Sequence, residues 1–352
     1  MNSFGNKIKL SISGGSHDES LGCVIYGLPR GARIDTELVN SLIMRRSAAS
    51  GGPGATPRHE ADIPHILSGA EEKDGCLVLD GSPLAVRFSN SSVRKSDYGH
   101  IARPSHADYV NFYKYGRVVS GGGASSGRIT LPMTFAGGVA ASILKTRGVG
   151  VVGHVLRIGG VSDEPFDPVE PELGTGADRS FPLVDTSKKE LMLSEIVSAR
   201  EAGDTLSCEC ECAITGVPVG TGEPVFGGIE SELSAFLFSI PGLRGVEFGE
   251  RRFLRGSQMN DEFQEGGRTV TNRSGGVNGG MANGMPIVFR AWFRPVPSIG
   301  IEQTGFDLDT GRPAPIKITG RHDTCILPRG LAAVEAAAYF CILDIMESCS
   351  ER

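Results

Sequence analysis

The sequence predicts an α+β fold in a single domain that spans residues 1–352. Segments with helical and strand-like patterns are interspersed without a regular βαβ alternation, which argues against a doubly wound sheet. Hydrophobic residues form 39% of the chain, enough for a sizeable core, and 22% of charged residues fits an ordinary globular protein. Because no repeat or shift in composition marks a boundary, we expect one domain.

Apolar patterns in the first half of the chain predict three strands and one helix. The strands are 8–13, 75–89 and 149–161. A helix is expected from Pro132 through FAGGVAASILKTR, since proline suits the first helical turn. Its Gly137 and Gly138 lower the helix propensity, but they permit a neighbouring element to pack very closely.

The stretch from Thr186 to Gly203 predicts an amphipathic surface helix with a Thr or Ser cap and a terminating glycine. In the segment that follows, Cys208, Cys210 and Cys212 alternate with polar residues, which predicts a strand with one buried face. The eight cysteines of the chain form no CxxC pair. We therefore expect reduced thiols packed in the core rather than disulfides or a zinc site.

The remaining elements follow from apolar faces and turn residues. Two core-facing helices are expected at 229–240 and 331–346, and two strands at 285–293 and 314–319. Clusters of Gly, Pro and small or acidic residues predict exposed loops. These loops are Ser47–Pro57 and Asp163–Asp178.

Charge and hydropathy exclude several classes of partner. The formal net charge of −6 leaves no basic footprint for nucleic acid. No stretch approaches the ~18 consecutive apolar residues of a membrane span, and the N-terminus lacks the apolar core of a secretory signal. We therefore expect a cytoplasmic protein with no nucleic-acid partner, no membrane partner and no metal site.

Four glycine-rich stretches also contain residues suited to catalysis. They are 13–22, 103–130, 272–284 and 318–325. Glycine lets the backbone approach a ligand and point N–H groups at phosphate, while His, Arg and Asp move protons or bind anions. No stretch is a Walker loop or a dinucleotide fingerprint. The pattern indicates a site for an anionic substrate or cofactor; tight turns without a ligand are the alternative.

These stretches resemble the motifs of one known family. SGGSHDESLG is similar to its GESHG signature, RPSHAD to RPGHAD and GGGASSGRIT to GGGRSSARET, and GVPVGTGEPVFGG, GSQMNDE and GRHDTC follow in the family's order. From about Phe4 to Met346 the chain resembles the chorismate synthase family. The resemblance implies a β-α-β sandwich, with a helical layer between antiparallel sheets, assembled as a cytoplasmic homotetramer.

The resemblance also implies a reaction. Members of the family eliminate phosphate and a ring proton from 5-enolpyruvylshikimate 3-phosphate, in an anti-1,4 sense, to give chorismate. The reaction needs reduced FMN although no net oxidation occurs. The protein's task is therefore to bind and orient its ligands and to manage the proton transfers. Since the sequence has no dinucleotide motif, we expect an external flavin reductase to supply the reduced FMN.

Carried over residue by residue, the resemblance assigns catalytic roles to five positions. His17 matches the histidine that protonates the leaving phosphate, and His106 the one that hydrogen-bonds the reduced flavin. Asp323 matches the aspartate near flavin N5 that assists its deprotonation. Ser16 and Ser126 occupy the positions of relay serines.

The resemblance also implies two sets of binding residues. The arginines expected to hold the substrate's carboxylates and phosphate are Arg45, Arg46, Arg58, Arg103, Arg128 and Arg321. The residues expected to contact FMN are Ser125, Ser126, Asn272, Gly280, Asn283, Arg294 and Ser298. For the paired arginines at 45 and 46, ordinary solvated side chains are an equal alternative.

The chain departs from the family pattern beside the expected site. Gly15 and Asp18 replace a glutamate and a glycine, Ala124 and Met133 replace arginines, and Ile129 replaces a glutamate. Three hypotheses follow: a chorismate synthase in which other side chains take over, a flavin-dependent paralogue that acts on a related, less anionic cyclohexene, or a catalytically idle flavin-binding protein. Because the expected proton-transfer residues are all present, we favour the two enzymes.

Overall fold

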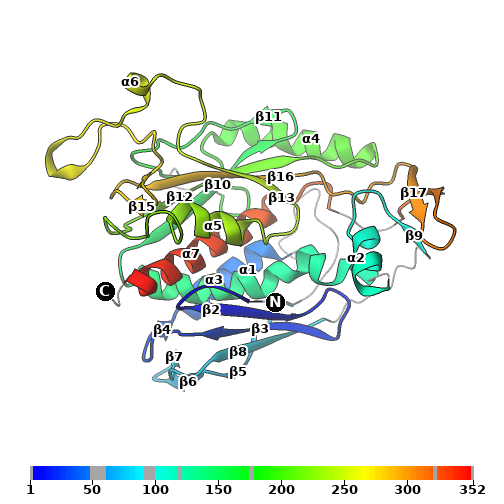
Figure 1. The fold of residues 1–352 in the computed structure, drawn as a ribbon, viewed down its shortest axis with the longest axis horizontal. Helices are drawn as coiled ribbons and strands as arrows, with labels where there is room; N and C mark the ends of the chain where they lie inside the picture. Colours follow the sequence, from blue (N-terminus) through cyan, green and yellow to red (C-terminus); the bar gives the residue numbers. More distant parts are fainter. Residues whose placement is uncertain are drawn as a thin grey trace.

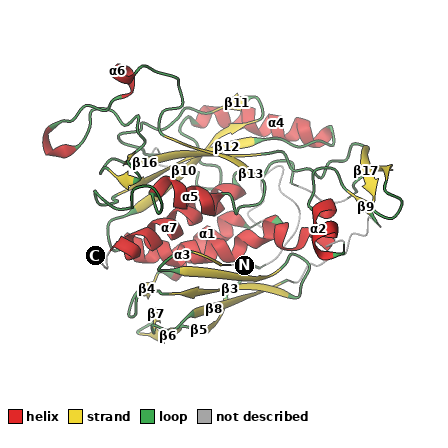
Figure 2. Cartoon of the chain, in the orientation of Figure 1, coloured by secondary structure: helices red, strands yellow, loops and turns green. Residues whose placement is uncertain are grey.

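The computed structural model describes residues 3–47, 61–90, 100–117, 120–173, 178–319 and 323–349. It is a sandwich in which a layer of helices lies between two antiparallel sheets (Figure 1, Figure 2). This arrangement confirms the α+β class and the helical layer expected from the sequence. Within these ranges, the longest apolar helices fall short of what a membrane span requires.

The N-terminal part of the chain builds the lower sheet of Figure 1. Its strands, in hydrogen-bonded order, are β1 (Ser3–Phe4), β2 (Lys9–Gly14), β3 (Ser20–Tyr26), β8 (Leu84–Ser89) and β5 (His65–Ser68). The predicted strand 75–89 is divided into β7 (Cys76–Leu79) and β8, because a turn in which Asp80 accepts the Ser82 N–H separates the two. A small sheet joins β7 to β4 (Arg33–Ile34) and β6 (Ala70–Lys73).

The upper sheet contains the other central strands that the sequence predicts. In hydrogen-bonded order they are β11 (Val161–Ser162), β10 (Gly150–Ile158), β12 (Cys208–Thr215), β16 (Ile287–Phe293) and β13 (Leu243–Phe248). The last predicted strand is β18, which forms a small sheet with two neighbours. These strands are β18 (Arg312–Ile316), β17 (Gln303–Asp307) and β9 (Ile101–Ala102), and a separate hairpin pairs β14 (Val277–Asn278) with β15 (Met281–Ala282).

The prediction that the cysteine strand buries only one face is wrong. β12 is central in its sheet, and both Glu209 and Glu211 on the supposedly exposed face are buried, the latter completely. Residues 163–173 and 178–184 cover this face, where Phe166 packs with Ala213 of β12. On the opposite face the three cysteines are buried, and none of the eight cysteines forms a disulfide.

Four helices fill the space between the sheets: α1 (Thr36–Arg46), α3 (Thr130–Lys145), α5 (Ile229–Leu237) and α7 (Arg329–Cys349). The close approach expected at the glycines of α3 is confirmed. A Cβ added to Gly137 would lie 2.4 Å from the Cα of Ala336 on α7, and one added to Gly138 would lie 3.0 Å from the Cα of Val39 on α1. The two glycines therefore set the spacing of the helical layer.

Other helices lie outside this layer. They are α2 (Asp108–Tyr115), α4 (Lys189–Glu201), α6 (Gly256–Met259) and the 3-10 turns η2 (Ser120–Ser125), η3 (Gly127–Ile129), η4 (Thr186–Lys188) and η5 (Glu265–Gly267). The predicted surface helix is η4 followed by α4, with Met192 and Ile196 buried. Its cap is Asp185, whose carboxylate accepts the Ser187 N–H at 3.0 Å, rather than a Thr or Ser.

The two predicted loops have different outcomes. Except for its first residue, Ser47–Pro57 lies outside the described ranges. The loop expected over Asp163–Asp178 contains no helix or strand in its described part, but it is not exposed throughout. Asp163 and Phe166 are buried, because this segment covers the outer face of the upper sheet.

Candidate active site

Ser16 and His17 lie in the tight turn that joins β2 to β3. The turn closes through a hydrogen bond from the Asp18 N–H to the Gly15 carbonyl at 3.3 Å, with Ser16 buried and His17 half-buried. A Cβ added to Gly15 would lie 3.3 Å from the Cα of Gly123, so the turn packs directly on η2. The structure thus brings the first two glycine-rich stretches together.

The serines of the second stretch lie at the junction of η2 and η3. Ser125 ends η2 and is exposed, whereas the Ser126 hydroxyl caps η3 by accepting the backbone N–H of Arg128 at 3.3 Å. Ala124 follows directly after the glycine that contacts the His17 turn. Gly15 and Ala124, two of the positions that depart from the family pattern, therefore both lie at the contact between the His17 turn and η2.

Three buried charges converge behind this contact. The Asp62 carboxylate receives Nη1 of Arg128 on one oxygen and Nη1 of Arg46 on the other, the latter at 3.4 Å. Arg46 also donates from Nε to the Thr130 hydroxyl and from Nη2 to the Gly127 carbonyl, each at 3.0 Å. Each of the three charged side chains is at most 7% exposed. For Arg46 the alternative of a solvated arginine is therefore wrong.

The electrostatics of this cluster favour an anion. Burial lowers the pKa of Arg46 to about 9, and the cations Arg329 and Arg128 add to this effect against the opposing carboxylates. An arginine normally keeps its proton far above this pH. Burial is the main cause of this lowered pKa, and the charge balance is seen from the contacts themselves. Arg46, Arg128 and Arg329 carry one more formal charge than Asp62 and Asp323, the two aspartates to which they bind, so this part of the cluster has an excess of positive charge. A bound phosphate or carboxylate would relieve that excess.

Asp323 joins the same cluster through Arg329, the first residue of α7. Nη1 of Arg329 lies 2.6 Å from the Asp323 carboxylate, and its Nε donates to the Arg46 carbonyl at 3.2 Å. Three arginines and two aspartates, from α1, α7, η3 and two loops, are thus directly linked. The structure brings together the predicted residues Arg46, Arg128 and Asp323.

His106 belongs to a second group of predicted residues. Its Nδ1 lies 3.0 Å from the Pro104 carbonyl, which only accepts, so Nδ1 carries a proton. Its Nε2 lies 2.7 Å from the hydroxyl of Ser298, which is buried. Arg294 donates to the Ser105 carbonyl at 3.4 Å. The loop after β16 therefore contacts the RPSHAD stretch.

Arg103 and Arg45 are held by internal ion pairs. Arg103 binds Asp108 with both Nε and Nη2, at 2.7 and 2.9 Å, and this pairing outweighs burial and lowers the pKa of Asp108. Nη1 of Arg45 lies 2.6 Å from Glu335 in the helical layer. Burial opposes its charge, but Glu335 raises the pKa of Arg45. Arg45 is therefore not a solvated side chain, but its ion-pair partner is Glu335 rather than Asp62, so its substrate role stays a prediction.

The other residues expected to contact FMN stabilise their own loop. The buried Asn272 amide donates to the Pro168 and Pro286 carbonyls and accepts the Gly276 N–H, all within 2.8 Å. Asn283 binds Asn278 at 2.7 Å and accepts the Met285 N–H at 3.0 Å. At Gly280, φ is +85° and a Cβ would lie 2.5 Å from the Glu223 carbonyl, so only glycine fits.

This loop precedes β16, whereas Arg294 and Ser298 follow it, and the two lie at opposite ends of that strand (Figure 1). A strand of this length spans about 20 Å. The residues predicted to contact FMN therefore form two separate groups within the chain. A role for the Asn272 loop at the cofactor stays a prediction.

Two predicted arginines, Arg58 and Arg321, lie outside the described ranges. Conversely, the sequence reasoning missed Asp62, Asn90 and Arg329. Asp62 and Arg329 stand close to motif residues, in TPRHEAD and after GRHDTC, and that proximity was the one signal available. Asn90 contacts both Arg128 and the His17 turn, but nothing in the sequence around it indicated a functional role.

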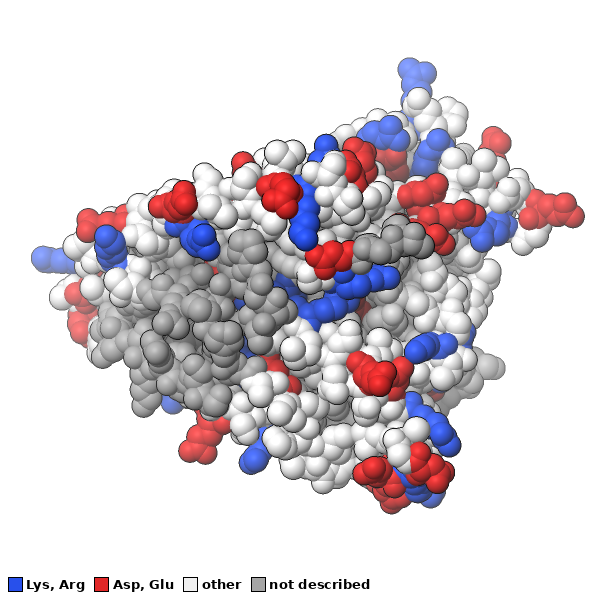
Figure 3. Space-filling view, turned by 180° about the vertical axis from the view of Figure 1, so that it is seen from behind, with Lys and Arg blue, Asp and Glu red and all other residues white. Residues whose placement is uncertain are grey.

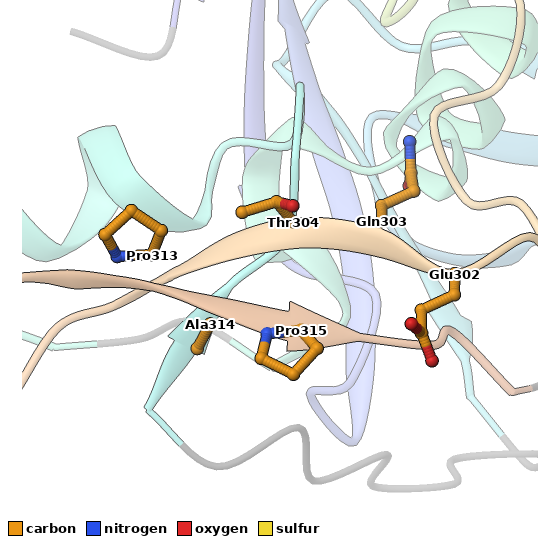
Figure 4. A pocket seen from close by; sticks show the side chains of 6 residues that line it. All are labelled: Glu302, Gln303, Thr304, Pro313, Ala314 and Pro315. Carbon is orange, nitrogen blue, oxygen red and sulfur yellow. The ribbon is translucent and has the colours of Figure 1, made fainter.

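Surface features agree with a site away from the β17–β18 hairpin. On the face seen from behind, basic side chains gather in a hollow near its centre (Figure 3). A pocket of about 270 Å³ on the hairpin is lined by Glu302, Gln303, Thr304, Pro313, Ala314 and Pro315 (Figure 4). This pocket contains no cation or nucleophile beyond a threonine hydroxyl, so it does not suit an anionic substrate. Within the described ranges no cluster of His, Cys, Asp and Glu could hold a metal ion.

The fold and the clustered charges suit an enzyme that acts on an anionic small molecule. The family model described as chorismate synthase matches residues 8–346. Chorismate synthases of Methanocella arvoryzae and Lancefieldella parvula are 39% and 35% identical, over 99% and 98% of this chain and 94% and 96% of theirs. The chain belongs to the chorismate synthase family, whose members are phosphate-eliminating lyases.

A crystal structure of chorismate synthase has the same fold. It superposes with a TM-score of 0.73 at 22% identity, covering 98% of this chain and 93% of the solved one. At that identity the likeness concerns architecture alone. It agrees with the helical layer between two antiparallel sheets described above.

Proposed function

We propose that this chain is a chorismate synthase that eliminates phosphate from 5-enolpyruvylshikimate 3-phosphate with the help of reduced FMN. The observation that carries the proposal is the buried cluster of Arg46, Arg128 and Arg329 around Asp62 and Asp323. Its excess positive charge suits a substrate that bears phosphate and carboxylates. Membership of the family supplies the identity of that substrate.

The proposed proton transfers use groups beside the cluster. His17 protonates the departing phosphate, because its turn packs on the segment that leads into Arg128. Asp323, held by Arg329, would assist the deprotonation of flavin N5, which is the role that the family resemblance assigns to it. Arg46 and Arg128 hold the anionic groups while bonds change, and they need no movement because Asp62 already fixes them.

The groups around His106 fit the polar edge of a flavin. An imidazole, the Ser298 hydroxyl and the Arg294 guanidinium offer donors and an acceptor from two adjacent loops. The amides of Asn272 and Asn283 are already bound to protein partners, so these two side chains hold the shape of the glycine-rich loop. Reduced FMN, when bound, supplies an electron transiently and accepts the ring proton. His106 and Ser298 would orient the cofactor and keep its ring electron-rich.

The proposal also covers the location of the protein, its oligomeric state and its source of reduced FMN. We expect a cytoplasmic homotetramer that depends on an external, NADPH-linked flavin reductase for reduced FMN. The absence of dinucleotide motifs from the sequence supports this dependence. The paralogue hypothesis keeps support from Gly15 and Ala124, since both lost side chains adjoin the His17 turn.

The decisive experiment is an anaerobic assay with photoreduced FMN and 5-enolpyruvylshikimate 3-phosphate, following phosphate release and chorismate absorbance. We expect turnover by the wild-type chain and a loss of about 10²- to 10⁴-fold in His17→Ala and Asp323→Asn. His100→Ala is the matched control, because this histidine is exposed and forms an ion pair with the equally exposed Asp309, away from the cluster. It should keep wild-type turnover.

The assay separates the competing hypotheses. Bound flavin without turnover of this substrate would favour the paralogue. Bound flavin with full turnover in both variants would contradict the proposed proton transfers. Chorismate formed aerobically from NADPH and FMN by the purified chain alone would contradict the dependence on an external reductase.

A further inference from the structure

Asn90, directly after β8, links two parts of the candidate site. Its Oδ1 accepts Nε of Arg128 at 3.1 Å. Its Nδ2 donates to the carbonyls of Gly15 and Asp18, at 3.2 and 2.8 Å. Its backbone N–H donates to the Glu19 carbonyl at 2.9 Å. One side chain thus spans the guanidinium of the anion cluster and both ends of the turn that contains His17.

We propose that Asn90 is a positioning residue that couples anion binding at Arg128 to the placement of His17. The inference rests on the proposed function, since it concerns how that site holds its acid against its anion clamp. Asn90 touches neither the substrate nor the cofactor in this proposal. It acts through Arg128 on one side and through the turn on the other.

The chemistry of the contacts requires an amide at this position. A guanidinium only donates, so it needs the amide oxygen, and backbone carbonyls only accept, so they need the amide nitrogen. The orientation of the Asn90 amide is therefore fixed by its partners. Aspartate has the same shape and would still accept from Arg128, but it would present a second acceptor to the Gly15 and Asp18 carbonyls.

Arg128 is oriented from two sides. Asp62 holds Nη1 and Asn90 holds Nε, so the guanidinium plane is fixed before an anion arrives. An anion that binds Arg128 restrains this plane further, and Asn90 passes that restraint to the turn at residues 15–18. Small displacements matter in such an arrangement, because a misplacement of about 1 Å can reduce a rate ~10²-fold.

A double-mutant cycle tests the coupling. We expect Asn90→Ala and Asn90→Asp each to lower kcat by about 10- to 10²-fold with little change in KM, because the anion clamp survives while the acid is misplaced. In the His17→Ala background, either change should have almost no further effect on kcat. Asn40→Ala, at an exposed position of α1, is the control and should leave kcat unchanged.

Three outcomes would overturn the proposal. They are wild-type kcat in Asn90→Asp, losses that multiply with those of His17→Ala, and a fall in melting temperature that accounts for the lost activity. Asn90→Gln separates misfolding from misplacement, since it keeps the amide but displaces it by one methylene. It should fold like the wild type and show the same loss of kcat.

A second measurement does not depend on turnover, so it distinguishes this inference from the proposed function. Inorganic phosphate added to the flavin-free protein should slow amide hydrogen exchange in residues 15–19 of the wild type. The same addition should not slow exchange there in Asn90→Asp. If phosphate protects the turn equally in both proteins, or in neither, the coupling is wrong even where the enzyme makes chorismate.

Discussion

Asp62 is the residue on which the buried charges depend. It is the carboxylate that Arg46 and Arg128 share, and it is only 4% exposed. Breaking a buried ion pair from one side leaves uncompensated charge and costs about 3–5 kcal/mol. We therefore predict that Asp62→Asn lowers the free energy of unfolding by about this amount, as measured by urea denaturation.

An exposed aspartate provides the comparison. Asp309 pairs with His100 at the surface, and Asp309→Asn should change the free energy of unfolding by no more than about 0.5 kcal/mol. Equal effects of the two substitutions would contradict the central role assigned to Asp62. Addition of phosphate should destabilise neither protein. It should partly restore the stability of Asp62→Asn, because phosphate can bind to Arg46 and Arg128, which have lost their shared carboxylate.

Which single residues could be predicted depends on how far apart their partners lie in sequence. His17, Arg128 and Asp323 stand inside motifs whose letters identify them. Asp62 contacts Arg128 across 66 positions, and Asn90 contacts the His17 turn across more than 70. Nothing in the local sequence encodes such contacts. Likewise, Arg45 and Arg46 are adjacent in sequence, but a turn of about 100° per residue sends them to different partners.

Among the elements, α3 and α7 make the tightest contact described above. Gly137→Ala would improve helix propensity by about 1 kcal/mol, but its Cβ would lie 2.4 Å from the Cα of Ala336. The helices would have to separate, and overpacking typically costs about 1–3 kcal/mol or more. We predict a net loss of stability, seen as a lower melting temperature. Gly160→Ala, with no atom within 4 Å of the added Cβ, should be nearly neutral.

The sheet and its covering segment are joined by a buried histidine. His154 of β10 lies 3.0 Å from Asp163 and 3.2 Å from Glu211 of β12, and Arg290 of β16 lies 2.7 Å from Glu211. Burial opposes its charge, but the hydrogen bonds to both carboxylates outweigh it and raise the pKa of His154. The same contacts, against burial, lower the pKa of Asp163 and of Glu211.

The sign of the pH dependence follows from these directions. A histidine with a raised pKa stabilises the fold fully below its usual value of about 6.5, and the contribution disappears as pH rises through the raised value. The carboxylates contribute above about pH 4 and lose their contribution on acidification. We predict that the melting-temperature difference between wild type and His154→Gln is largest near pH 5–6 and shrinks by pH 9. A constant difference would contradict the assignment.

Element prediction succeeded where one face is apolar and failed where polar residues are buried. The helices α5 and α7 were found from their apolar faces, and α3 was found from the apolar segment that follows Pro132. The double burial of β12 was missed because Glu211 reads as a solvent-facing residue until His154 and Arg290 meet it. The helix α1 was not predicted, although Asp35 caps it by accepting the Leu38 N–H at 3.0 Å and Val39 and Leu42 form its buried stripe.

For the whole molecule, the sequence predicted the layers but not their pairing. The mixture of apolar helices and strands gave the α+β class, and the family resemblance gave the helical layer between sheets. The order of strands could not be read from sequence, since β3 pairs with β8 across a long connection and β12 lies between strands from both halves of the chain. Such order follows from the packing of the complete core.

One feature of the whole molecule points to assembly. The segment between β13 and the Asn272 loop projects from the sandwich as an arm that carries α6 (Figure 1). Its base is well held, because Asp261 accepts the Arg273 and Ser274 N–H groups at 2.8 Å each. Yet Phe253 is fully exposed on it and Phe263 is 79% exposed. Large apolar side chains presented on an ordered projection are typical of an interface.

We predict that these phenylalanines pack against another copy of the chain in the homotetramer proposed above. Each would gain about 1.5–3 kcal/mol on burial, and symmetry repeats that gain at every equivalent interface. The double variant Phe253→Ser, Phe263→Ser should therefore shift the mass found by light scattering toward smaller species at micromolar concentration. Phe238→Ser, at a 53% exposed position directly after α5, is the control and should leave the mass unchanged. A wild-type monomer, or an arm variant of undiminished mass, would show that the arm serves another purpose.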